Sequence, residues 1–248
     1  MRKYWGPVRV LAPVVIIAAL FALIAPSITS GIADERVRNG VLIQALPFFG
    51  AFVAVLLTYI LLIFLIALRF NGKIPNRTYS GVETVLIVGI LGGVVLLFQP
   101  IHFVGYRYGF LLVLGALLSF IVWSHVIGRS AKADVRLPRF TGVQQAAGAA
   151  AFVVIAVLIA GLVINTNAPR EPYGVRERVW NTYDDARKAE IAAAASSSFN
   201  TVEIPFVIAF SLVPAALFFF IVREAAASLG KSEESTDAKA AVPQRSSA

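Results

Sequence analysis

The run Val41–Leu68 decides the class of this protein. It reads VLIQALPFFGAFVAVLLTYILLIFLIAL and contains no charged residue. A helix needs about 20 mainly apolar residues to cross the hydrocarbon layer of a bilayer, and this run is long enough to cross at a tilt. Five further apolar runs carry no charge at their centres: Val10–Ala25, Gly81–Phe98, Gly109–Ile127, Val143–Ile164 and Ile204–Val222. We therefore expect an all-α integral membrane protein with six transmembrane helices.

The composition supports a single membrane domain. Of 248 residues 58% are hydrophobic, whereas a soluble domain is usually about 45–50% apolar. Residues 1–224 are expected to form one six-helix domain, and residues 225–248 a disordered cytoplasmic tail without apolar periodicity. The expected helices cover about 8–26, 41–68, 81–98, 107–127, 143–164 and 202–223, with a further exterior or interfacial helical loop at 174–197. The first run is interpreted as a membrane helix rather than a signal peptide, because no clean small-x-small cleavage site follows it.

Positive charge falls mainly on one side of these spans. Fourteen of the 22 Lys and Arg residues lie in the terminal segments and the second and fourth loops, and eight lie in the other loops. Loops rich in Lys and Arg stay in the cytoplasm, so we expect both termini there and the protein in the cytoplasmic (inner) membrane. The same distribution argues against nucleic acid as a partner, since no basic domain is available to hold a duplex.

Three of the predicted helices begin with a similar polar pattern: Ser80–Glu83, Thr141–Gln144 and Asn200–Glu203. In each, a short polar side chain can accept from a helix amide while the acid or amide three residues later reaches back, as in a capping box. Glu83 and Glu203 are the acids closest to the membrane interior. We interpret them as helix caps rather than as proton or ion sites.

Candidates for cofactor chemistry are few. The chain has no Cys, which excludes disulfides and thiolate metal sites, and its two His are His102 and His125. The predicted helix between them spans roughly 30 Å, so the two cannot hold one haem or metal ion. We expect no catalytic residue, no metal and no cofactor. A bound lipid, quinone or pigment is the alternative, with His102 and His125 as separate contacts.

Signals for helix packing are stronger than signals for chemistry. Gly89 and Gly93 form a GxxxG motif in the third helix, and Gly115 and Ser119 are small residues at the same spacing in the fourth. Small residues let helix backbones approach closely inside a membrane. We therefore expect these four residues at helix–helix contacts.

The exterior loop carries an apolar edge. Val175, Val179 and Tyr183 recur at helical spacing, and Trp180 lies beside them. Such an edge suits a helix lying in the membrane interface, and it would serve equally as a docking surface for another subunit.

The main evidence on function is the lack of charged residues at the centres of the spans. No Lys, Arg, Asp or Glu lies at the centre of a span, where one would cost about 2.5–3.5 kcal/mol. This favours a non-catalytic integral subunit that scaffolds or stabilises a larger membrane complex, such as an electron-transfer complex of photosynthesis or respiration. Its partners would be other integral membrane subunits and the lipid bilayer.

Two other functions stay open. The layout of six spans with a long exterior loop is also that of a permease component of an ATP-driven exporter. A membrane enzyme would have to use His125, Glu83 or Glu203 as its acid–base groups.

Overall fold

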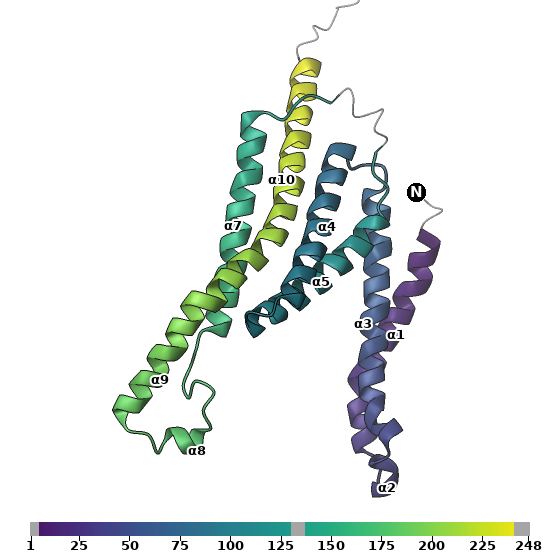
Figure 1. Ribbon diagram of the computed structural model, residues 1–248. Helices are drawn as coiled ribbons and strands as arrows, with labels where there is room; N and C mark the ends of the chain where they lie inside the picture. The colour runs from purple at the N-terminus through teal and green to yellow at the C-terminus, as the bar shows by residue number, and fades with distance from the viewer. Residues whose placement is uncertain (1–4, 130–136, 241–248) are drawn as a thin grey trace, which may run out of the picture. The chain divides into compact units, whose positions relative to one another are not determined.

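The computed structural model describes residues 5–129 and 137–240, and this part of the chain is helical and contains no strand (Figure 1). Six helices are long and apolar enough to span a membrane, which confirms the predicted fold class. They are α1 (Trp5–Ser30), α3 (Val41–Phe70), α4 (Asn76–Phe98), α5 (Phe103–Ser124), α7 (Gly142–Asn167) and α10 (Ile204–Ala240).

The spans are distributed over two compact units. The first unit holds α1, α3, the short helix α2 (Glu35–Arg38) and the segment Ile121–Arg129. The second holds α4, α5 up to Phe120, α7 and α10. Hydropathy identifies which runs can cross a membrane, but it does not say which helix faces meet, so this division was not predictable from it.

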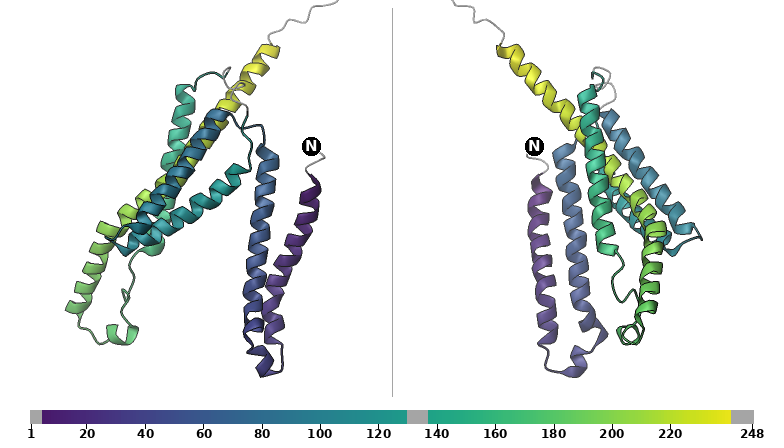
Figure 2. Two further views of the ribbon diagram at one scale, coloured as in Figure 1. Left: turned by 45° about the vertical axis from the view of Figure 1, so that its right-hand side comes forward. Right: turned by 90° about the vertical axis from the view of Figure 1, so that its left-hand side faces the viewer.

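The first unit is built on a hairpin of α1 and α3 (Figure 2). Gly50 lies at their contact, where an added Cβ would be 3.0 Å from the Phe21 ring and 3.3 Å from the Ala22 Cα. Gly50 is the only buried residue of the 30-residue helix α3, and the others are exposed or half-buried. Pro47 lies inside this helix.

The segment after α5 belongs to the first unit because it is hydrogen-bonded to the end of α3. The amide of Ile127 donates to Asn71 Oδ1 at 2.7 Å, and its carbonyl accepts from the Gly72 amide at 2.8 Å. The Arg129 amide donates to the Ile74 carbonyl at 2.8 Å. Gly72 has φ +69°, a conformation in which glycine is unstrained.

The second unit is centred on α10, with α7 and α4 each packed antiparallel against it (Figures 1 and 2). Glycines stand at these contacts. An added Cβ at Gly81 of α4 would lie 2.4 Å from the Phe220 ring, and one at Gly148 of α7 would lie 2.9 Å from the Phe219 carbonyl oxygen. The two neighbouring helices therefore approach α10 only because these positions carry no side chain.

The closest approach in the second unit is between α4 and α5. An added Cβ at Gly93 would lie 2.9 Å from the Val113 amide nitrogen and 3.0 Å from the Gly109 carbonyl oxygen. Conversely, one at Gly109 would lie 2.9 Å from the Gly93 carbonyl oxygen. Backbone thus meets backbone here, and neither glycine can be replaced without moving a helix.

One of the three predicted capping boxes is confirmed. The Gln144 amide donates to Thr141 Oγ1 at 3.4 Å, and the Thr141 amide donates to Gln144 Oε1 at 3.0 Å. The cap at Ser80–Glu83 is wrong, because α4 starts earlier, at Asn76. Pro75 precedes that start with φ −59°, which is already suited to a helix N-terminus, so Glu83 lies two turns inside α4.

The cap at Asn200–Glu203 is also wrong. Helix α9 (Asp185–Ser198) continues through a π-helical turn, η2 (Phe199–Glu203), directly into α10. Most of the exterior loop 174–197 is helical as expected, and its helix α9 continues into the last span. Its start is broken into α8 (Glu177–Trp180) and a turn that ends where Asp184 accepts from the Arg187 amide at 2.8 Å.

The end of the chain differs from the expectation as well. Helix α10 continues to Ala240, through most of the tail that we expected to be disordered from residue 225. Pro214 lies inside this helix, and the tail after it is rich in Ala, Glu and Lys, which are good helix formers. Residues 241–248 lie outside the described part of the chain.

We predict that Gly93→Ala destabilises the protein although alanine is the better helix former. The added methyl group would overlap the α5 backbone, and such overpacking costs about 1–3 kcal/mol. The matched control is Gly92→Ala, since nothing lies within 4 Å of an added Cβ at Gly92. Thermal midpoints in detergent should fall for Gly93→Ala and stay or rise for Gly92→Ala; equal midpoints would contradict the close α4–α5 contact.

Candidate functional site

Two polar clusters lie at different levels of the second unit, each around one acid of the continuous helix formed by α9, η2 and α10. Glu203 closes the π-helical turn η2, and Glu224 lies further along α10. At about 1.5 Å per residue, roughly 30 Å of helix separates them. This matches the thickness of the hydrocarbon layer, about 30 Å, so the two clusters fit the two edges of a bilayer.

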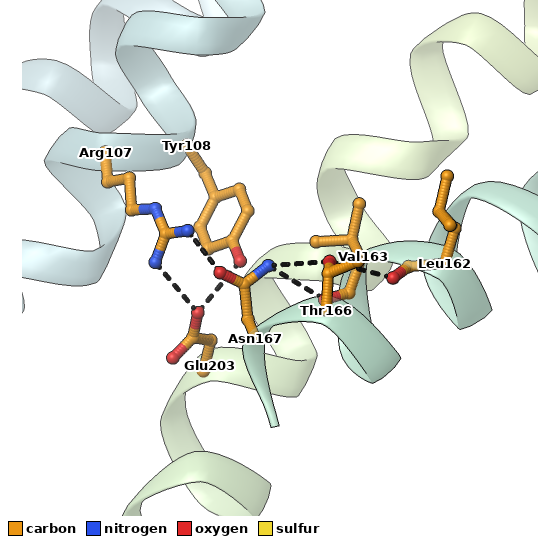
Figure 3. Close-up of polar contacts among 7 residues, drawn as sticks. All are labelled: Arg107, Tyr108, Leu162, Val163, Thr166, Asn167 and Glu203. Carbon is orange, nitrogen blue, oxygen red and sulfur yellow. Dashed lines mark hydrogen bonds and ion pairs between the residues drawn. The ribbon is translucent and has the colours of Figure 1, made fainter. Parts of the chain in front are cut away.

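The first of these, the Glu203 cluster, consists of Glu203 with Arg107, Tyr108 and Asn167 (Figure 3). Arg107 Nη1 lies 3.3 Å from Glu203 Oε1, and the Tyr108 hydroxyl donates to the same oxygen at 2.9 Å. A second guanidinium nitrogen of Arg107 donates to Asn167 Oδ1. The cluster thus joins the start of α5, the end of α7 and the turn before α10.

The members of the Glu203 cluster differ in burial. The Tyr108 residue is 1% exposed and its ring packs 5.9 Å from that of Phe210, whereas the Arg107 side chain is 48% exposed. An exposed ion pair contributes about 0–1 kcal/mol, but a hydrogen bond to a charged group contributes about 1.5–3 kcal/mol. The tyrosine is therefore expected to stabilise this contact more than the arginine does.

The end of α7 is held by side-chain bonds to its own backbone. Asn167 Nδ2 donates to the Val163 carbonyl at 2.8 Å, and the Thr166 hydroxyl donates to the Leu162 carbonyl at 2.9 Å (Figure 3). The Asn167 amide group is thereby oriented, with its oxygen directed to Arg107. A helix end near lipid needs such partners, because bilayer hydrocarbon offers none.

The second, the Glu224 cluster, consists of Glu224, Arg77, Thr78, Arg223 and Phe140. Arg77 donates two hydrogen bonds to the carboxylate, from Nε to Oε2 at 3.2 Å and from Nη2 to Oε1 at 3.3 Å. The buried Thr78 hydroxyl donates to Glu224 Oε2 at 2.7 Å. A third nitrogen of Arg77 donates to the Pro138 carbonyl at 2.7 Å, which ties the segment before α7 to α4.

The Phe140 ring makes cation–π contacts with two arginines of this cluster. The guanidinium carbon of Arg77 lies 3.8 Å from the centroid of the Phe140 ring, and that of Arg223 lies 4.0 Å from it. Such cation–π contacts are favourable within about 6 Å. The Glu224 cluster therefore holds two positive charges and one negative charge, whereas Arg107 and Glu203 balance each other.

The two histidines lie at opposite ends of α5, and both are exposed. Gln99 accepts from the His102 amide at 3.0 Å, so this residue contributes its backbone to the α4–α5 turn. The His125 Nδ1 lies 2.8 Å from the Ile121 carbonyl oxygen. Neither is brought to another candidate residue, and the described residues contain no group of three His, Cys, Asp or Glu able to hold a metal ion.

The predicted packing residues divide into two pairs. Gly89 and Gly93 are buried, and an added Cβ at Gly89 would lie 3.0 Å from Val213 and 3.2 Å from Ala116. Gly115 and Ser119 are exposed, and an added Cβ at Gly115 would meet nothing within 4 Å. The packed face of α5 is a different one, formed by Gly105, Tyr108, Gly109, Leu112 and Ala116.

The exterior edge is only partly available for docking. Val179 is exposed and Val175 and Tyr183 are half-buried, but Trp180 is buried within the loop itself. Its ring meets that of Tyr173 edge-on at 5.5 Å, and Lys188 Nζ lies 5.9 Å from it. Trp180 therefore fixes the loop onto the start of α9 and offers little surface to a partner.

Most residues of the two clusters were not singled out from the sequence. Glu203 is interpreted from the sequence as a helix cap, without Arg107, Tyr108 and Asn167 as its partners. Arg77 and Arg223 enter the sequence analysis only through the charge distribution, and Phe140 does not enter it. A usable signal was present in the predicted spans: Arg107 and Glu203 fall at the same membrane edge, as do Arg77 and Glu224. Opposite charges at one depth are natural partners.

No protein-family model matches the chain, and comparison with curated proteins and with solved structures gave no match.

We predict that Tyr108→Phe lowers the free energy of unfolding by about 1.5–3 kcal/mol, because it removes only the hydroxyl that donates to Glu203. Tyr106→Phe is the matched control, on the same helix with an exposed ring, and should change stability by less than about 0.5 kcal/mol. Denaturation with SDS in mixed micelles measures both. Equal effects would show that the buried hydroxyl does not stabilise the cluster.

We further predict that Arg77→Gln destabilises the protein more than Arg107→Gln. The Arg77–Glu224 ion pair is bidentate, and its side chains are 24% and 19% exposed. Arg107 contacts Glu203 through one nitrogen only. We expect a loss of about 1.5–3 kcal/mol for Arg77→Gln and about 0.2–1 kcal/mol for Arg107→Gln. The same SDS titration decides the order, and the reverse order would refute it.

Proposed function

We propose that this protein is a non-catalytic integral membrane subunit that scaffolds or stabilises a larger membrane complex. The observation that carries the proposal is the surface of α3. This helix packs against α1, yet only Gly50 of its 30 residues is buried, and its exposed residues are almost all apolar. Apolar surface of this extent is typically covered by lipid or by another protein surface.

An aromatic group on α3 favours a protein partner. Phe48, Phe49 and Phe52 are each more than half exposed, and the Phe48 ring lies 5.8 Å from that of Phe49 and 6.4 Å from that of Phe52. Aromatic residues are enriched in the buried centres of protein interfaces, where they dominate binding energy. We name these three residues the α3 aromatic face and propose it as a contact with another integral subunit.

The polar residues of the second unit fit a supporting role. Helix α4 has no ionisable residue after Glu83, and α10 has none between Glu203 and Arg223. These two stretches therefore contain no group that could relay protons. The acids Glu203 and Glu224 are engaged by arginines and hydroxyls that hold helix ends together. These groups act on the geometry of the bundle, which is what an assembly subunit requires.

The setting of this function follows from the charge distribution. We propose the cytoplasmic (inner) membrane with both termini in the cytoplasm, supported by the excess of Lys and Arg on that side. A complex that carries electrons is the first class to examine, since such a complex would show an absorption spectrum after purification.

We predict that the protein extracted in mild detergent from its native membrane carries other integral subunits, as measured by native mass spectrometry. Replacing Phe48, Phe49 and Phe52 by Leu keeps the surface compatible with lipid, and should lower the recovered partner about tenfold. The matched control replaces Val153, Val154 and Val157 by Leu on the exposed face of α7 and should leave recovery unchanged.

A lone monomer or homodimer would refute the proposal. Stimulation of a co-reconstituted ATPase would instead favour the exporter permease.

A further inference from the structure

We infer that Arg223, held against Phe140, Phe219 and Phe220 in the Glu224 cluster, binds a phosphate group, supplied either by a lipid headgroup or by free phosphate.

Three aromatic rings surround the guanidinium group of Arg223 but give it no hydrogen-bond acceptor. Its guanidinium carbon lies 4.0 Å from the centroid of Phe140 and 4.9 Å from those of Phe219 and Phe220. Aromatic rings attract the cation through their faces, yet they offer no acceptor to N–H groups in the guanidinium plane. The Nε atom of Arg223 is buried and makes no hydrogen bond within the described chain.

Arg77 provides an internal comparison, because it stacks on the same Phe140 ring. Its in-plane donors are engaged by both oxygens of Glu224 and by the Pro138 carbonyl. Among the described residues, no acid forms an ion pair with Arg223. Of the two guanidinium groups on this ring, Arg77 is hydrogen-bonded to the Glu224 carboxylate, whereas Arg223 makes no ion pair with any described residue.

The charge balance favours one further anion. Both guanidinium carbons lie within 4.0 Å of the Phe140 centroid, so the two like charges are close, and Glu224 neutralises one of them. An uncompensated charge next to hydrocarbon is costly. A singly charged anion at Arg223 would bring the Glu224 cluster to neutrality, as Arg107 and Glu203 are at the other end.

The position selects the chemistry of that anion. The Glu224 cluster lies about 30 Å along the helix from the Glu203 cluster, and hence fits the level where lipid phosphates lie. A guanidinium presents its donors in a planar fork that matches phosphate oxygens. A phosphodiester carries one negative charge, which is the charge the cluster lacks.

The experiment titrates detergent-purified protein with phosphatidylglycerol and, separately, with phosphatidylcholine, and counts bound lipid by native mass spectrometry. Phosphatidylglycerol carries net negative charge and should bind in preference to phosphatidylcholine. Arg223→Gln should weaken this binding about tenfold, as expected for loss of one charge-assisted hydrogen-bonded contact. The matched control is Arg187→Gln, which removes the same charge from an exposed pair with Glu190 on α9 and should bind as the wild type does.

The two phosphate sources are separated by a competition arm. Displacement of phosphatidylglycerol by millimolar inorganic phosphate would show that phosphate alone fills the site, and resistance to it would show that the site takes a lipid. If Arg223→Gln does not fold, Arg223→Lys takes its place, because it keeps the charge and removes the planar fork. Binding of phosphatidylglycerol at wild-type strength by the folded Arg223 variant overturns the inference.

Discussion

Membrane hydrocarbon cannot solvate a charge, and the structure of the second unit depends on this constraint. Arg77 and Arg107 lie in the first turns of α4 and α5, and their partners Glu224 and Glu203 are separated along the last helix by about the thickness of the hydrocarbon layer. At each end the acid receives both an arginine and a hydroxyl. Such partners remove the cost of a poorly hydrated carboxylate, and they connect helices that are distant in sequence.

Between these ends, glycine decides how closely the helices approach. Lipid tails are as apolar as leucine, so helices inside a bilayer associate through packing rather than through hydrophobic burial. Gly81 and Gly148 admit the side chain and backbone of α10, and Gly93 and Gly109 bring α4 and α5 into backbone contact. The polar clusters connect helices that are distant in sequence, and the glycines determine how closely neighbouring helices pack.

The sequence predicted individual spans better than their relations. Val41 is the start of α3 as expected, and the Thr141–Gln144 box begins α7, because both depend on neighbours within one turn. The Glu203 cluster could not be assembled in this way, since Arg107 and Glu203 are far apart in the chain and meet only through packing. The expectation of a cap at Asn200 failed for a related reason. Local polarity resembled a helix start, but no residue there breaks the helix.

The continuity of α9, η2 and α10 has a mechanical consequence. A flexible loop would let the exterior segment move without disturbing the spans, but a hydrogen-bonded helix resists twisting and bending along its length. A force applied to α9 therefore acts as a torque on the same rod that carries Glu203 and Glu224. The π-helical turn, with its wider and less regular hydrogen bonding, is one compliant point of that rod, and Pro214, which lacks an amide donor, is another. Bending at the π-helical turn would occur beside the Tyr108 hydroxyl, at the boundary between water and lipid.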